Sequence, residues 1–312
     1  MGKLLEGKCA VVTGSGGGIG KAIAIALAAH GASVVVNDYG GSANGIGYSS
    51  KPANEVVDEI KREGGVAVPN YDTVADYKSA ANIIQTCTDN FGKIDILVNC
   101  AGIIRWLWIY EYTEEDWDSV IDVHLKGTFN CARHASVLMQ QQKSGRIINF
   151  TSEGWLGGVL SAAYCAAKGG IVSFSKAVAK DMAIDGITCN VVCPRATTRL
   201  GDNDRQVPLK LLEVGYLNEE KYKEVISKPR TTPYPPEAVA PIAVYLSSEY
   251  ASNINGKVFW SEGGKISLFS DPDEVKSIYK EGIWTQEELI KLMPKSLSQN
   301  LKNRWVSAKR PL

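Results

Sequence analysis

The sequence predicts an α/β fold with a doubly wound parallel sheet of seven strands. Short runs rich in valine and isoleucine alternate along the chain with longer stretches whose apolar residues lie three or four positions apart. This alternation is typical of βαβ units. The short runs are also apolar almost throughout, as expected of strands that helices cover on both faces.

The elements follow one another in a regular order over residues 1–265. The predicted strands are residues 9–13, 33–37, 66–70, 94–99, 146–150, 188–193 and 257–260. The predicted helices between them are residues 20–29, 54–63, 78–91, 115–140 and 163–183. We therefore expect a single domain that ends near residue 265.

Two segments break this order. Residues 196–236 are rich in proline, arginine, threonine and charged residues, with one helical pattern at 217–226. A connection this long inside a domain is usually functional, so we expect a lid over the substrate. Residues 266–312 hold two short amphipathic patterns, 273–279 and 285–293, which predict a C-terminal helical tail.

Composition and charge exclude several classes of partner. The chain has 312 residues, with 34 Lys plus Arg against 34 Asp plus Glu. This balance argues against a nucleic-acid partner, because phosphate binding needs a basic surface. No apolar stretch reaches the ~20 residues of a membrane helix, so we expect no membrane partner. The seven cysteines form no CxxC pair, which predicts neither disulfides nor a bound metal. We expect a reduced, cytoplasmic protein.

A glycine-rich turn follows the first predicted strand. Gly14, Gly18 and Gly20 have the spacing GxxxGxG, which lets the backbone turn tightly and approach a pyrophosphate at a helix N-terminus. The alternative is a turn that binds nothing. Asp38 ends the second strand, and a carboxylate there accepts hydrogen bonds from a ribose and repels a 2′-phosphate. No lysine or arginine lies between Gly14 and Gly20, so we predict NAD rather than NADP.

A tyrosine and a lysine open the last long helical pattern. Tyr164 and Lys168 are four residues apart and therefore share one helix face. A nearby cation favours the phenolate and lowers the tyrosine pKa from ~10, as a general base for a secondary alcohol requires. Thr151 and Ser152 end the preceding strand, and a hydroxyl there is suited to hold the substrate oxygen.

These motifs occur in the order found in the short-chain dehydrogenases/reductases. The chain resembles that family through the glycine turn, residues 99–102, a strand-end serine, Tyr-x-x-x-Lys and residues 262–264. The resemblance implies a Rossmann-type sheet, a homodimer or homotetramer, and NAD(P)-dependent interconversion of alcohols and carbonyls. It implies that Tyr164 is the general acid/base, that Lys168 tunes it and binds the nicotinamide ribose, and that Ser152 orients the substrate. The cofactor contacts it implies are Gly14, Ser15, Gly18, Ile19, Gly20, Asp38, Asn99, Ala101, Gly102, Tyr164, Lys168, Pro194 and Thr198.

A narrower likeness is to the (3R)-hydroxyacyl-CoA dehydrogenase part of peroxisomal multifunctional enzyme type 2. It rests on residues 36–41, the insert 45–47, and residues 67–72, 123–127 and 194–199. It implies NAD as the cofactor, with Asp72 and Val74 near the adenine.

The chain departs from the family pattern at its site. His124 replaces an asparagine thought to kink a helix and pass protons to the lysine, so it is a candidate relay; a kink or core histidine is the alternative. Arg195 replaces the usual glycine after Pro194, and Thr198 is the expected carboxamide contact. The spacing from Ser152 to the tyrosine is one residue short, so Thr151 competes with it. We favour Ser152, which keeps the family's register from the strand.

The substrate side is predicted from residues that follow the strands. Trp106, Trp108 and Trp155 predict a bulky apolar substrate, although packing elsewhere is expected for at least one. Candidates for binding a carboxylate or the phosphates of CoA are Arg105, Arg195, Arg199, Arg205 and Arg230; solvated charges are the alternative.

The function predicted is hydride transfer between a secondary alcohol and NAD, on a hydrophobic 3-hydroxyacyl-CoA or similar thioester. One alternative is a free bulky alcohol, such as a steroid, terpenoid or aryl carbinol. Another is a catalytically silent NAD-binding subunit, which is expected to have lost the tyrosine or the lysine.

Overall fold

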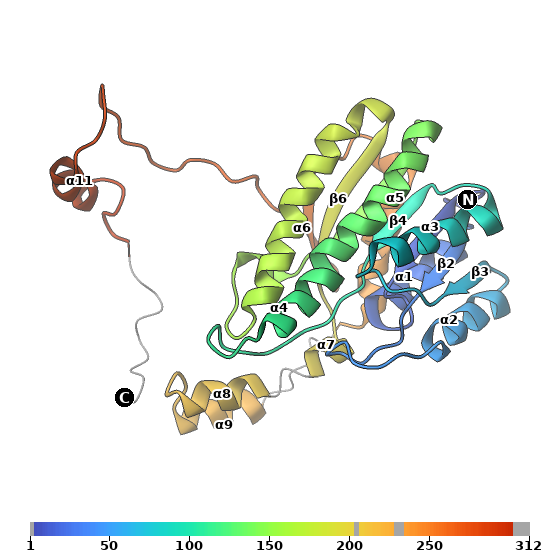
Figure 1. Ribbon diagram of the computed structural model, residues 1–312, viewed down its shortest axis with the longest axis horizontal. Coiled ribbons are helices and arrows are strands. Elements are labelled where there is room, and N and C mark those ends of the chain that lie inside the picture. Colours follow the sequence, from blue (N-terminus) through green and yellow to red (C-terminus); the bar gives the residue numbers. More distant parts are fainter. Residues whose placement is uncertain (1–2, 203–205, 228–233, 302–312) are drawn as a thin grey trace. The chain divides into compact units, whose positions relative to one another are not determined.

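The computed structural model describes residues 3–202, 206–227 and 234–301. The chain divides into a first unit, residues 1–207 and 229–269, and a second unit, residues 208–228 and 270–312. The first unit holds the sheet and all residues predicted for catalysis and cofactor binding (Figure 1). Arg205 and Arg230 lie outside the described residues.

Eight strands form one sheet in the order β3-β2-β1-β4-β5-β6-β7-β8. In chain order they are β1 Cys9–Thr13, β2 Ser33–Asn37, β3 Val66–Asn70, β4 Ile96–Asn99, β5 Gly145–Phe150, β6 Ile187–Arg195, β7 Val258–Glu262 and β8 Lys265–Leu268. The first seven are parallel, which confirms the predicted doubly wound architecture.

The count exceeds the predicted seven by one edge strand. β8 runs antiparallel to β7 after the turn at residues 263–264, and Glu262 pairs with Lys265. β8 has four residues, three of them exposed, so it lacks the buried apolar run by which the parallel strands were recognised.

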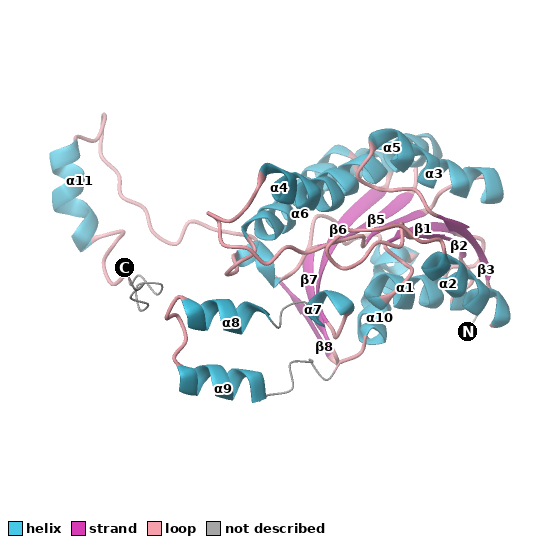
Figure 2. Cartoon of the chain, turned by 60° about the horizontal axis from the view of Figure 1, so that its bottom comes forward, coloured by secondary structure: helices cyan, strands magenta, loops and turns pink. Residues whose placement is uncertain are grey.

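Helices cover both faces of the sheet. Figure 2 shows α1 (Gly18–Ala29), α2 (Lys51–Arg62) and α10 (Ala240–Ser247) on one face. The other face carries α3 (Tyr77–Phe91), α4 (Glu114–Ile121), α5 (Gly127–Gln142) and α6 (Ala162–Asp181). The helix predicted over 115–140 is interrupted by a π-helix, Asp122–Lys126, and α10 was not predicted.

Two apolar layers sandwich the sheet because neighbouring strand residues point to opposite faces. Val12, Val34 and Val36 pack against α1, α2 and α10. Val11 and Val35 belong to the layer beneath α3, α5 and α6. All five are fully buried, so burial of apolar surface fixes the strand register.

The strand register aligns the residues that follow the strands. Thr13 pairs with Asn37 on one side and with Asn99 on the other, and Asn99 pairs with Asn149. The strand order reverses between β1 and β4, and ligands of open α/β sheets bind at such a switch point, beyond the carboxyl ends of the strands.

The remaining helices lie in the segments predicted to be a lid and a tail. α7 (Arg199–Asp202) belongs to the first unit, whereas most of α8 (Gln206–Glu213) and all of α9 (Glu219–Ser227) belong to the second. α9 matches the helix predicted at 217–226, and α8 was not predicted. The lid function stays a prediction.

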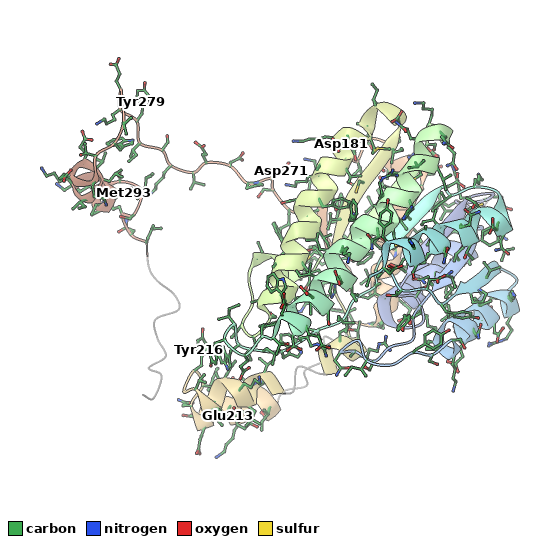
Figure 3. The ribbon with its side chains drawn as sticks, in the orientation of Figure 1. Asp181, Glu213, Tyr216, Asp271, Tyr279 and Met293 are labelled. Carbon is green, nitrogen blue, oxygen red and sulfur yellow. The ribbon has the colours of Figure 1, made fainter. Side chains whose placement is uncertain are left out.

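The tail contains one of its two predicted helices. α11 (Gln286–Leu292) begins at a capping box in which Thr285 and Glu288 bond each other's backbone, an arrangement that fixes a helix start. Residues 273–279 are not helical. Val275 and Tyr279 are 92% and 89% exposed, and Tyr279 projects away from its neighbours (Figure 3). A short helix without packing partners is unstable. No helix in the described ranges is both long and apolar enough to span a membrane.

Candidate active site

The backbone of Gly14, Gly17, Gly18 and Gly20 in and after the turn that follows β1 forms a glycine surface that lines a cavity. The Thr13 hydroxyl oxygen accepts hydrogen bonds from the backbone N–H groups of Cys100 (3.1 Å) and Ala101 (3.3 Å), which ties this turn to the segment after β4. A Cβ atom on Gly14 would lie 2.6 Å from the Ala101 Cα, and one on Gly20 would overlap the Gly14 carbonyl. Only glycine fits at these two positions, because a side chain there would collide with neighbouring backbone.

Asp38 is held at the same edge of the sheet. Its carboxylate accepts hydrogen bonds from the N–H groups of Gly16 (2.8 Å) and Gly40 (2.7 Å). Its own N–H donates to the Asn70 carbonyl at 3.1 Å. The side chain is therefore fixed beside the glycine turn, as the cofactor prediction requires.

Asp72 and Val74 line the cavity next to Asp38. Asn37 Nδ2 donates to the Asp72 carbonyl and to Asn70 Oδ1, both at 2.8 Å. This network of strand-end amides fixes the loop after β3, where the sequence placed the adenine contacts.

The predicted catalytic side chains converge on one cavity of about 360 Å³. Tyr164 and Lys168 come from the first turns of α6, and Ser152 follows β5. Lys168 Nζ donates to the Phe150 carbonyl at 2.7 Å and lies 5.5 Å from the centre of the Tyr164 ring. The Ser152 hydroxyl accepts a hydrogen bond from the Gly154 N–H at 3.3 Å and lies close enough to the phenol to lower its pKa. The ring of His124 stands edge-on to the phenol, with centroids 5.1 Å apart.

Burial is the main cause of the pKa shifts of Tyr164 and Lys168. It raises the pKa of Tyr164 to about 12, a shift that the hydrogen bond with Ser152 opposes. It lowers the pKa of Lys168 to about 8. The sequence predicted that Lys168 would lower the tyrosine pKa; in the structure Lys168 Nζ donates to the Phe150 carbonyl, and burial sets the direction of the Tyr164 shift. A phenolate near neutral pH therefore needs a further positive charge at the site.

His124 lies in the π-helix between α4 and α5 and is 1% exposed. Its Nε2 lies 2.6 Å from the Ile103 carbonyl oxygen and 3.0 Å from the Ile103 nitrogen. Burial and the nearby Lys168 charge lower the pKa of His124 to about 3. The ring is therefore neutral at physiological pH, and the predicted proton relay would have to use the neutral form.

The two candidate hydroxyls at the end of β5 have different partners. Thr151 is 2% exposed, and its hydroxyl donates to the Lys168 carbonyl at 2.9 Å. Ser152 is half-buried and faces the phenol of Tyr164. The geometry therefore favours Ser152 as the residue that orients a substrate oxygen.

The structure places some predicted residues behind the site. Ser15 and Asn99 are not among the described residues that line the two cavities. The Ser15 hydroxyl donates to the Val12 carbonyl at 2.7 Å, and Asn99 Nδ2 donates to Asn149 Oδ1 at 2.9 Å. Both stabilise the segments that carry the glycines.

The three tryptophans separate in space. Trp106 lines the catalytic cavity. Trp155 packs edge-on against Phe269, with ring centroids 5.4 Å apart, and Trp108 stacks with Tyr110 at 6.2 Å. In the described part of the chain neither Trp108 nor Trp155 lines a cavity of the site.

Sequence reasoning missed one wall of the second cavity. Residues from the glycine-rich loop after Asp38 line it, namely Tyr39, Gly40, Gly41, Ser42 and Gly45. The Ile104 N–H donates to the Ala43 carbonyl at 3.0 Å, so the loop is anchored over the segment after β4. The glycine content was a signal, but no role was assigned to it. Glu153, beside Ser152, also lines the catalytic cavity and was missed.

The described residues fit a nicotinamide dinucleotide. A second cavity of about 360 Å³ adjoins the catalytic one. The catalytic cavity contains the tyrosine, lysine and serine, and the second contains Asp72 and Val74. The glycine surface borders the catalytic cavity, and Gly14 lines both cavities. Pro194 and Thr198 line the catalytic cavity, as predicted for contacts to the nicotinamide half.

Comparison with known proteins identifies this arrangement. The family model described as short chain dehydrogenase matches residues 8–206, more than half of the chain. The chain belongs to the short-chain dehydrogenase family. It is therefore an oxidoreductase of a family with the Rossmann-like fold, whose cofactor is NAD or NADP.

This short-chain dehydrogenase has relatives of two lengths. It is 38% identical over 260 residues to the peroxisomal multifunctional enzyme type 2 of Drosophila melanogaster, over 83% of this chain and 39% of that enzyme. It is 40% identical over 265 residues to the 3-oxoacyl-[acyl-carrier-protein] reductase of Synechocystis, over 84% of this chain and 98% of the reductase. The chain thus spans less than half of the multifunctional enzyme.

A solved structure agrees with the fold. The crystal structure of a short chain dehydrogenase from Mycobacterium avium matches with a TM-score of 0.78 and 36% sequence identity. The match covers 99% of this short-chain dehydrogenase and 98% of the other chain.

The two hydroxyls of this short-chain dehydrogenase are distinguished by paired substitutions. Ser152→Ala is expected to lower kcat by about 10²-fold, because a donor to the reacting oxygen is lost. Thr151→Val is expected to leave kcat within a few-fold and to lower the free energy of unfolding by about 1 kcal/mol, because only a structural hydrogen bond is lost. Steady-state kinetics and thermal unfolding measure both effects. A larger loss of kcat in Thr151→Val would reverse the assignment.

Proposed function

We propose that this chain is an NAD-dependent dehydrogenase that interconverts the secondary alcohol and the ketone of an acyl thioester with a hydrophobic acyl group. The observation that carries the proposal is the convergence of Ser152, Tyr164 and Lys168 on one cavity that adjoins the glycine surface. In that cavity a general acid/base, a cation and a hydroxyl donor all face the same space.

The chain's own residues perform the proton chemistry. In the oxidation direction the Tyr164 phenolate takes the proton of the substrate hydroxyl, and the Ser152 hydroxyl holds the substrate oxygen. Lys168 contributes a positive charge at a fixed position, because the Phe150 carbonyl accepts its hydrogen bond. NAD+, when bound, accepts the hydride and lends the positive charge that favours the phenolate. Ketone reduction uses the same residues, with Tyr164 as the acid.

The preference for NAD rests on Asp38. Its carboxylate is oriented by two backbone N–H groups and lines both cavities. A negative charge fixed at this point accepts hydrogen bonds from ribose hydroxyls and repels a 2′-phosphate. The fixed orientation of Asp38 therefore supports NAD as the cofactor.

The acyl thioester is supported by the relatives and by the cavity wall. One relative carries the name 3-oxoacyl-[acyl-carrier-protein] reductase, and a 3-oxoacyl group is the oxidised partner of a 3-hydroxyacyl group. Ile104 and Trp106 give the catalytic cavity an apolar wall, which suits an acyl chain. The alternative of a free bulky alcohol as substrate rested on three tryptophans around the site. It has less support because Trp106 is the one of the three that lines the catalytic cavity. A silent subunit is disfavoured because Tyr164 and Lys168 are both in place.

Purified protein tests the proposal directly. With NAD+ and a medium-chain 3-hydroxyacyl-CoA, formation of NADH is expected, and the N-acetylcysteamine thioester of the same acid is expected to react as well. Aryl carbinols, terpenoid alcohols and hydroxysteroids serve as the comparison set. Turnover of these alcohols without turnover of either thioester would overturn the substrate class, and no turnover of any alcohol would support the silent subunit. The homo-oligomer and the cytoplasmic location stay predictions.

A further inference from the structure

A cation stands where the two cavities of the cofactor site meet. Four residues line both cavities: Gly14, Asp38, Gly102 and Arg199. The first three follow β1, β2 and β4, whereas Arg199 follows β6 and begins the short helix α7. Among the described residues that line both cavities, Arg199 is the one positive charge.

The segment that carries Arg199 lies against the glycine turn. A Cβ atom placed on Gly18 would lie 3.6 Å from the Thr198 methyl group. Gly18 is also the first residue of α1, a helix of 12 residues. The side chain of Arg199 is exposed and thus accessible to a ligand on the glycine surface.

The junction requires positive charge if a dinucleotide is to cross it. The pyrophosphate joins the two halves of the dinucleotide, so it lies between the groups that bind each half. Asp38 adds a negative charge at this point, and the N-terminus of α1 offsets it by a partial charge alone. Two other cations of the catalytic cavity already have partners: Lys168 donates to a carbonyl, and Arg195 pairs with Glu262 at 3.5 Å.

We propose that Arg199 binds the pyrophosphate of the dinucleotide and thereby holds both halves in register. The proposal rests on the dinucleotide binding of the proposed function and is independent of the substrate class. It moves Arg199 from the substrate, where the sequence placed it, to the cofactor. A guanidinium suits the role because it forms two parallel hydrogen bonds with phosphate oxygens.

Ligand binding to the full chain without substrate tests this assignment. Isothermal titration is carried out with NADH, NADPH, ADP-ribose and adenosine on the wild type and on Arg199→Gln, Arg199→Lys and Arg133→Gln. Arg199→Gln is expected to lower the affinities for NADH and ADP-ribose by at least about tenfold, the effect of one lost charged hydrogen bond. Its affinity for adenosine is expected to equal that of the wild type. Arg199→Lys is expected to be intermediate. Arg133→Gln, the matched control, removes an exposed arginine of α5 that lines neither cavity, and it is expected to bind NADH like the wild type.

The other outcomes overturn the proposal. An unchanged affinity of Arg199→Gln for ADP-ribose means that the side chain does not reach the pyrophosphate. An equal loss of affinity for adenosine means that Arg199 supports either the adenosine half of the site or the folded state. The melting temperature of the variant distinguishes these two cases. A loss for NADPH much larger than for NADH means that Arg199 binds a 2′-phosphate instead. Failure of the proposed function is distinct, since it would appear as NADH binding without turnover of any thioester.

Discussion

Tyr164→Phe is expected to lower kcat for alcohol oxidation by about 10³-fold or more and to leave NADH binding unchanged. Tyr164 is half-buried and lines the cavity beside Ser152 and Lys168, and no other described phenol lines this cavity. Removing the hydroxyl therefore removes the proton acceptor, a loss in the range of about 10²–10⁴-fold for general acid/base catalysis. Steady-state kinetics and a titration with NADH measure the two quantities on the same variant.

Tyr112→Phe provides the matched control. Tyr112 packs in the same small apolar cluster as Tyr164, and its hydroxyl donates to the Arg105 carbonyl at 3.1 Å. Its removal is expected to lower the free energy of unfolding by about 1 kcal/mol and to change kcat by no more than a few-fold. Equal losses of kcat in the two variants would mean that packing of the cluster, and not proton transfer, explains the result for Tyr164.

The pH dependence follows from the direction of the tyrosine shift. Burial raises the pKa of Tyr164 to about 12, so the phenol is protonated at neutral pH and is ready to act as the acid in ketone reduction. Oxidation needs the phenolate, whose fraction grows about tenfold per pH unit below the pKa. We therefore expect oxidation to accelerate with rising pH up to about pH 8, where Lys168 begins to lose its positive charge, while reduction stays nearly constant over the same range. The positive charge of NAD+ is expected to lower the pKa of Tyr164 in the complex, so the rate of oxidation levels off at a pH below the pKa of Tyr164 in the free protein.

The strands could be predicted because each carries its own signal. The segment 34–36 consists of three valines that are fully buried in the structure, and such a run is uncommon outside a sheet covered on both faces. β8 gave no such signal because its residues are largely exposed. The interruption at His124 was indicated by the family resemblance alone, since the apolar spacing of a helix hardly changes where hydrogen bonds lengthen to form a π-turn.

The site was predictable where its geometry is local. Tyr164 and Lys168 share one turn of a helix, and the glycines share one turn of the chain, so spacing alone indicates their proximity. The direction of the tyrosine shift depends on burial, which comes from distant segments. The place of Trp155 depends likewise on Phe269, more than a hundred residues away. Arg199 reaches the cofactor junction through the return of the chain after β6, which no spacing reveals.

Asp38→Ala is expected to reverse the cofactor preference and to change the ratio of NADH to NADPH affinity by about 10²-fold or more. The variant loses an acceptor for the ribose hydroxyls, and a charged hydrogen bond contributes about 1.5–3 kcal/mol. It also loses the negative charge that opposes a 2′-phosphate. The affinity for NADPH is therefore expected to rise while the affinity for NADH falls. Both affinities are measured by isothermal titration of each variant.

Asp72→Asn separates this specific effect from a general change of charge. Asp72 lines the same cavity, but its carboxylate accepts a hydrogen bond from Asn70 Nδ2 at 2.9 Å. Neutralising it is expected to change both affinities equally and to preserve their ratio.

A wild type that binds NADPH as tightly as NADH would show that the carboxylate of Asp38 serves the backbone of Gly16 and Gly40 alone. The two carboxylate oxygens of Asp38 already accept hydrogen bonds from these backbone N–H groups. A ribose hydroxyl must therefore use the remaining lone pairs of these oxygens. The ratio of the two affinities reports directly whether it does.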